Sequence, residues 1–178
     1  MAITKIAQVD VGVGGVATID FTSIPQTFTD LMVVVSGRSS YNFGMLDLKF
    51  TFNGSTTGYS EIYMYGSGAS AASGSDTSTT NGRVLGVIGD TTTTANTFSN
   101  AAITIANYSG ATNKMCSIDG VSEANATSAR QTLVTQIWAN TAAITSISLY
   151  PQLGSWVQYS SATLYGISKS GATGATVA

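Results

Sequence analysis

The segment Met45–Phe52 alternates apolar and polar side chains with a period of two. The apolar members of this alternation are Leu46, Leu48, Phe50 and Phe52. This period matches a β-strand with one buried face. Asn53 and Gly54 follow at once, and an Asn-Gly pair favours the two positive φ angles of a type I′ turn. We therefore expect a hairpin in which Tyr59–Tyr65 is the returning strand.

Similar short apolar or alternating runs continue along the chain. They predict strands at residues 16–21, 30–35, 83–88, 101–107, 114–121, 132–139, 144–149 and 157–167. The run at 30–35 is apolar on both faces and is expected to be fully buried. Residues 66–82 have almost no large apolar side chain, which predicts a long, mobile surface loop. Residues 89–97 predict a second loop, and the alanine-rich segment 123–133 is compatible with a short helix or a loop.

This organisation indicates an all-β fold, an antiparallel, jelly-roll-like β-sandwich of about eight to ten strands. Composition agrees, because only 9% of the residues are charged and the polar remainder is rich in strand-forming Thr and turn-forming Ser, Asn and Gly. We expect residues 1–15 to form an N-terminal arm or a first strand. Residues 16–168 should form one sandwich domain with a variable loop at 66–82, and residues 169–178 a flexible tail.

The ionisable residues exclude several classes of function. Seven basic against nine acidic side chains give a net charge of −2, so no basic surface for nucleic acid is expected. The chain has no histidine, the commonest general base and metal ligand, and its one cysteine, Cys116, cannot form an internal disulfide or a zinc cluster. We expect no metal, cofactor or catalytic site. No apolar stretch predicts membrane insertion or a signal peptide.

Carboxylates offer the one enzymatic alternative. Glu61, Asp119 and Glu123 are the candidates for a pair that could perform acid–base chemistry on a glycan. Their spacing does not show such a pair, so the chain is expected not to be an enzyme.

Aromatic side chains give the candidate binding surface. Tyr59, Glu61, Tyr63 and Tyr65 alternate along one strand, so the face that they share is both polar and aromatic. We interpret this face as a strand surface that is directed to solvent or to a neighbouring subunit, or as a platform that stacks on sugar rings. The aromatic side chains in the C-terminal third of the chain are compatible with a place in the core, in a protein interface or on a ligand platform. The candidate interface or glycan-facing residues are Tyr59, Glu61, Tyr63, Tyr65, Trp138 and Trp156.

Three segments carry a resemblance to known proteins. They are FTSIPQTFTDL at Phe21–Leu31, ANTAAITSI at Ala139–Ile147 and VQYSSATLYGI at Val157–Ile167. Over most of the chain, from about Ile19 to Ile167, the sequence resembles small virion structural proteins of tailed bacteriophages of the marine and cyanobacterial type.

The resemblance implies a jelly-roll-like subunit on the outer surface of a phage particle, assembled in the host cytoplasm. The role that it most favours is that of a capsid decoration, or cement, protein that clamps major capsid proteins as a homotrimer and carries no catalytic residues. A terminal arm at Ala2–Asp10 is then expected to contact the shell. The alternative is a module of a tail fibre, head fibre or baseplate that binds host surface glycans through its aromatic face and its loops.

Overall fold

The computed structural model describes residues 1–122, 125 and 129–168. This part of the chain folds into twelve strands and contains no helix. No helix long and apolar enough to cross a membrane occurs among the described residues. The strands are β1 (Ala2–Asp10), β2 (Ile19–Phe21), β3 (Asp30–Gly37), β4 (Leu46–Phe52), β5 (Tyr59–Ser67), β6 (Ser70–Thr79), β7 (Gly82–Ile88), β8 (Ser99–Ala106), β9 (Lys114–Val121), β10 (Arg130–Trp138), β11 (Ile147–Pro151) and β12 (Ser161–Ser168).

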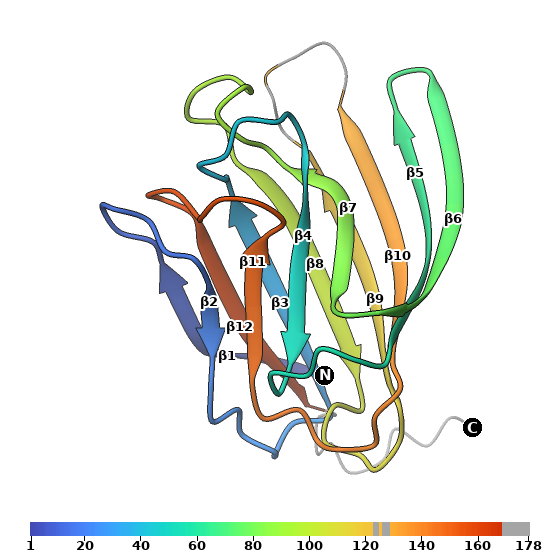
Figure 1. Cartoon of the computed structure of the whole chain (residues 1–178). Coiled ribbons are helices and arrows are strands. Elements are labelled where there is room, and N and C mark those ends of the chain that lie inside the picture. The colour runs from blue at the N-terminus through green and yellow to red at the C-terminus, as the bar shows by residue number, and fades with distance from the viewer. Residues whose placement is uncertain (123–124, 126–128, 169–178) are drawn as a thin grey trace, which may run out of the picture.

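Two antiparallel sheets pack face to face, which confirms the predicted all-β sandwich (Figure 1). The large sheet has the order β1-β12-β3-β8-β9-β10-β5-β6, and the small sheet has the order β2-β11-β4-β7. The small sheet covers one face of the large sheet, with β7 against β10, β8 and β9. No described part of the chain forms a second layer on the opposite face of the large sheet, and the β5–β6 hairpin forms one of its ends (Figure 1).

The core lies between the sheets, and the predicted alternation of β4 is confirmed. Its four apolar side chains from Leu46 to Phe52 are fully buried, while Asp47 and Lys49 are only half-buried. The large sheet contributes the alternate residues of β3, β8 and β9 to the same core. These residues are Leu31, Val33, Val35, Ala101, Ile103, Ile105, Cys116 and Ile118. The prediction that 30–35 is buried on both faces is wrong, because Val34 on the other face is 38% exposed.

The prediction of a mobile loop at residues 66–82 is also wrong. Residues 70–79 form β6, which pairs with β5 across a two-residue turn. In this turn Gly68 has a φ of 58°, the conformation that a tight hairpin with glycine in its first position requires. Small polar side chains do not prevent a strand here, because the backbone ladder to β5 holds it.

The Asn53-Gly54 turn forms as predicted, but the hairpin does not. Both residues have positive φ, and the Ser55 amide donates to the Phe52 carbonyl at 2.9 Å. The Asn53 side chain accepts a hydrogen bond from the Thr145 amide at 2.8 Å, so the turn is fixed to the loop before β11. β4 and β5 then enter different sheets. The turn therefore links the two layers of the sandwich instead of pairing its flanking strands.

The remaining segments follow the predictions to different extents. The expected strand at 16–21 is limited to Ile19–Phe21, and residues 89–97 form the expected loop. Ala2–Asp10 is β1, an edge strand paired with β12. In the segment 123–133, β10 begins at Arg130, whereas residues 123, 124 and 126–128 lie outside the described residues, as do residues 169–178.

Candidate functional site

Three of the six candidate residues are core side chains. Tyr59, Trp138 and Trp156 are at most 1% exposed. The Tyr59 ring stacks on Trp138 with ring centroids 6.1 Å apart, and the Tyr59 hydroxyl accepts a hydrogen bond from the Phe52 amide at 2.8 Å. The Trp156 indole donates to the Leu149 carbonyl at 3.0 Å. Their polar atoms are satisfied inside the fold, and their rings have no exposed face on which a sugar or a partner protein could stack.

Tyr63 and Tyr65 are half-buried and form a column with two arginines. The two rings stack with centroids 6.4 Å apart and an interplanar angle of 19°. The Arg83 guanidinium lies 5.8 Å from the Tyr63 centroid, and the Arg130 guanidinium lies 3.9 Å from the Tyr65 centroid. Each contact is a cation–π interaction. The column attaches β5 to β7 and β10, so the predicted aromatic face points into the sandwich and not outward.

Glu61 is an internal ion-pair residue. Its carboxylate accepts a hydrogen bond from Arg83 Nε at 2.5 Å, and the same guanidinium also pairs with Asp76. The second oxygen, Oε2, is buried without a hydrogen-bond partner. Burial raises the pKa of Glu61 above its ordinary value, although the hydrogen bond and charge of Arg83 act in the opposite direction. The carboxylate ties β5, β6 and β7 together.

The other candidate carboxylates do not join Glu61. Asp119 is exposed on the opposite face of the large sheet, where its carboxylate accepts a hydrogen bond from Gln131 at 3.5 Å. Glu123 lies outside the described residues. Glu61 and Asp119 therefore do not face a common cleft, as a glycosidase pair would have to. No group of three or more acidic, cysteine or histidine side chains that could hold a metal ion occurs within residues 1–122, 125 and 129–168.

Cys116 and Lys114 carry reactive groups, but both are buried inside the fold. Cys116 is 2% exposed, and burial raises the pKa of its thiol, which opposes formation of the nucleophilic thiolate. Lys114 is fully buried, and burial lowers the pKa of its amine. The Lys114 ammonium donates to the carbonyls of Gly110 at 2.6 Å and Thr112 at 2.5 Å, so it holds the turn before β9.

The threonine-rich loop at 89–97 is organised around one arginine. Arg38 is 8% exposed, and its guanidinium donates to the carbonyls of Thr93 at 3.0 Å, Thr94 at 2.7 Å and Thr97 at 3.2 Å. The buried carboxylate of Asp90 closes the start of the same loop, because it accepts hydrogen bonds from the amides of the 43–44 turn and from Thr92. These polar groups fix loop geometry and point inward.

The open face of the large sheet carries a different set of side chains. We call this side, which points away from the small sheet, the outer face. Six large apolar residues are exposed on it: Ile3 (53%), Val34 (38%), Met115 (53%), Leu133 (44%), Ile62 (66%) and Met64 (56%). Met64 and Leu133 are direct cross-strand partners on β5 and β10. We call Ile62, Met64, Met115 and Leu133, on the neighbouring strands β5, β10 and β9, the apolar patch.

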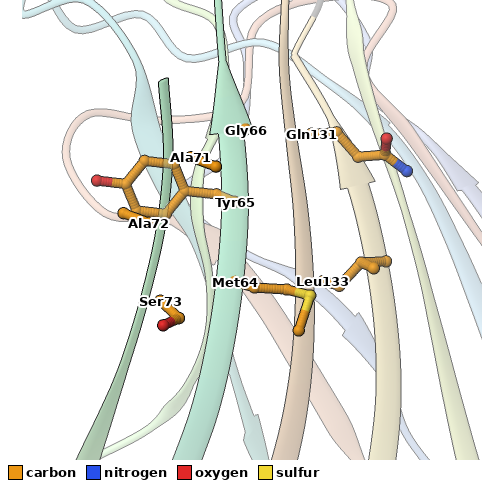
Figure 2. A pocket seen from close by; sticks show the side chains of 8 residues that line it. All are labelled: Met64, Tyr65, Gly66, Ala71, Ala72, Ser73, Gln131 and Leu133. Carbon is orange, nitrogen blue, oxygen red and sulfur yellow. The ribbon is translucent and has the colours of Figure 1, made fainter. Parts of the chain in front are cut away.

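The apolar patch is hollowed where β5, β6 and β10 meet. A depression of about 480 Å³ lies over Met64 and Leu133, with Ala71 and Ser73 of β6 on one side and Gln131 on the other. Figure 2 shows the Met64 thioether extending toward Leu133 across this depression. Two smaller hollows continue along the patch toward Thr135 and Ile137. No charged side chain of the described residues lines the depression over Met64 and Leu133.

Sequence reasoning missed the apolar patch for a definable reason. Along β5, Ile62 and Met64 alternate with Tyr63 and Tyr65, so both faces of the strand are apolar enough to be buried. Periodicity identifies two faces but not which one the second sheet covers. Which face of β5 is covered depends on contacts with other strands. The arginines that cover the tyrosine rings belong to β7 and to the start of β10, and neither lies next to β5 in the sequence.

Comparisons of the chain with models of protein families, with curated proteins and with solved structures gave no match. The candidate functional site is therefore defined by the geometry alone. It is the outer face of the large sheet, centred on the apolar patch.

Proposed function

We propose that this chain is a non-enzymatic structural protein of a bacteriophage particle, a capsid decoration protein that binds the outer shell through its apolar patch. One observation carries the proposal. Exposed large apolar side chains gather on three neighbouring strands of one sheet face and are not covered by any described part of the chain. The observed antiparallel sandwich agrees with the fold that the sequence resemblance implies.

The dimensions of the apolar patch suit a protein partner. The face that carries it, three strands about 4.8 Å apart and each about eight residues long at about 3.4 Å per residue, covers about 400 Å², and the four apolar side chains occupy part of it. Clusters of exposed apolar side chains mark interaction sites, because burying them against a partner removes them from water. Asp119, the cross-strand neighbour of Leu133 on β9, borders the patch, but no described charged side chain lines the depression over Met64 and Leu133, so the patch fits a broad, largely uncharged protein surface better than a small polar ligand.

Avidity makes such a surface sufficient for a shell protein. A modest apolar contact gives weak binding in one copy, but neighbouring copies that are linked to each other bind with a much higher effective concentration. Covering a surface that is poor in charge also costs little free energy of desolvation. These properties support a protein that is present in many copies on a regular lattice.

The glycan-binding module of a tail fibre, head fibre or baseplate is the competing function. The predicted form of it depends on the aromatic face of β5 and on Trp138 and Trp156, whose rings are buried. The exposed rings of Tyr41, Phe43 and Tyr159 lie elsewhere, in loops. We therefore favour the decoration role, and the glycan role becomes one outcome of the test.

The number of copies in the purified virion tests the proposal. Quantitative mass spectrometry of particles that carry this chain should find on the order of hundreds of copies, comparable with the major capsid protein, since decoration follows the lattice. A few copies or a few dozen would overturn the decoration role and favour a tail or fibre position.

Matched lysine variants test the surface. Met64→Lys and Leu133→Lys place a charge in the apolar patch, and we expect their occupancy on particles to fall at least tenfold. Thr56→Lys makes the same change on an exposed loop between β4 and β5 and should bind like the wild type. Equal occupancy of all three variants would show that another surface contacts the shell.

A further inference from the structure

The two sheets of the sandwich have four edge strands, and proteins usually shield such edges from pairing with other chains. β2, at one edge of the small sheet, is only three residues long. β7, at the other edge, is shielded by side chains. Gln136 of β10 accepts a hydrogen bond from the Arg83 amide at 3.3 Å, and Thr132 of β10 donates one to the Leu85 carbonyl at 2.9 Å.

The first edge of the large sheet is also protected. β1 carries the exposed charges of Lys5 and Asp10, and its pairing with β12 is broken by a bulge between Lys5 and Ala7. Charges on an edge strand, lysine in particular, and bulges are the common devices against edge-to-edge pairing.

The second edge of the large sheet, β6, has none of these devices along most of its length. It is ten residues long and contains no proline, lysine or arginine. From Ser70 to Asp76 its register with β5 is unbroken, and a shift occurs only near Thr79. Its one charged side chain, Asp76, is paired with Arg83 in the same subunit. Figure 1 shows β6 as the outermost strand, with no element beyond it.

We propose that β6 pairs with β6 of a second copy of this chain. A two-fold axis perpendicular to the sheet makes the two identical strands antiparallel, so that two eight-stranded sheets become one continuous sheet. The residues that face each other on the outer side are small and uncharged: Ala71, Ser73 and Ser75. No like charges meet across the axis on this side, so the strand is compatible with itself.

The contact length and the orientation favour a second copy over an isolated peptide. Seven regular residues at about 3.4 Å each give a ladder about 24 Å long. The depression over Met64 and Leu133 is bordered by Ala71 and Ser73 of β6, so in the pair it lies beside the same depression of the second copy. Both apolar patches then lie on the same side of the joined sheet. The pairing rests on the edge strand alone and not on the proposed shell binding, but it gives the paired subunits one doubled apolar surface.

Disulfide trapping locates the contact directly. In a two-fold pair, a cysteine near the axis faces its own position or one two residues away, so Ala71→Cys, Ser73→Cys and Ser75→Cys, alone or in pairwise mixtures, should form covalent dimers under mild oxidation. Ser117→Cys, on the outer face of central strand β9, and Thr56→Cys serve as controls and should cross-link at least tenfold more slowly. Native Cys116 is buried and does not compete. Faster trapping of Ser117→Cys would indicate face-to-face packing, and no trapping at β6 would equally overturn the proposal.

The oligomeric state in solution gives an independent measurement. Light scattering after size-exclusion chromatography should give a dimer for the wild type and a monomer for Ser73→Lys/Ser75→Lys, because four ammonium groups then gather at the axis. Thr104→Lys/Ser117→Lys adds the same charge to central strands and should remain dimeric, and circular dichroism checks that each variant folds. A monomeric or trimeric wild type, or a dimer that the β6 lysines leave intact, overturns the pairing. The copy number of the wild-type chain on the virion is measured independently of these variants, and it tests the proposed function separately.

Discussion

Gly120 on β9 faces Val87 on β7 so closely that a β-carbon on the glycine would lie 2.8 Å from Val87 Cγ1. The same atom would lie 2.9 Å from Val84 Cγ1. Real β-carbons do not approach other atoms this closely, and Gly120 does not have a positive φ. Glycine is therefore present because it lacks a side chain, and the two sheets pack together at this point because of it.

Gly120→Ala should lower the free energy of unfolding by about 1–3 kcal/mol, because the added methyl group forces the valines of β7 away from β9. Urea or guanidinium denaturation measures the change. Gly12→Ala is the control, since a β-carbon there meets nothing within 4 Å and the φ is not positive. We expect this variant to stay within about 0.5 kcal/mol of the wild type. An equal loss in both variants would contradict the sheet-contact explanation, because the effect of Gly→Ala on the unfolded chain raises stability.

Glu61→Gln should change how stability depends on pH. Burial raises the pKa of Glu61, so the folded protein holds this proton more tightly than the unfolded chain does. The contribution of Glu61 to the free energy of unfolding therefore falls as pH rises from its ordinary pKa of 4.5 through the raised value. Denaturation curves across this interval should show a shallower fall for Glu61→Gln. A wild-type slope in Glu61→Gln would contradict the assignment.

Arg38→Lys should loosen the 89–97 loop. A lysine ammonium cannot reproduce the planar fork with which Arg38 reaches the carbonyls of Thr93, Thr94 and Thr97 together. We expect a loss of about 1–3 kcal/mol and faster amide hydrogen exchange that is confined to the loop. Exchange that increases equally in β9 would show that the arginine stabilises the whole sandwich and not the loop.

Cys116 should not react with a thiol reagent such as Ellman's reagent while the protein is folded, because its sulfur is buried and its pKa is raised by that burial. Reactivity should appear with the same midpoint as unfolding in denaturant. Thr56→Cys provides an exposed thiol that reacts at once. Rapid labelling of Cys116 in the native protein would show that the core around β9 opens locally.

The sequence predicts those strands in which apolar and polar side chains alternate strongly. Leu46, Leu48 and Phe50 on β4 have polar neighbours, so only one packing is possible, and it is observed. β6 is different, because Ala, Ser, Gly and Thr give no burial signal. Its strand conformation depends on the backbone ladder with β5, and the short Gly68 turn is the local feature that indicates it.

The candidate site was harder to predict than the fold for a physical reason. Ile62 and Tyr63 are both large and apolar, and which of them is covered depends on Arg83 and Arg130 from distant strands. Local pattern also identified the Asn53-Gly54 turn without showing that its two strands enter different sheets, because the side-chain bond from Asn53 to Thr145 is not local. The sequence pattern thus indicates strands and turns, whereas the assignment of faces requires the tertiary partners.

The pairing of β1 with β12 sets a limit on when the molecule can fold during synthesis. β12 lies between β1 and β3 in the large sheet, so neither of those two earlier strands can complete its ladder until residues 161–168 have left the ribosome. Until then Leu31, Val33 and the rest of the β3 ladder stay open on one side, and open strands favour aggregation. Long-range ladders of this kind also form slowly. The nascent chain therefore completes its sandwich only after residues 161–168 have emerged from the ribosome. Until then its open strands are exposed to binding by cellular chaperones.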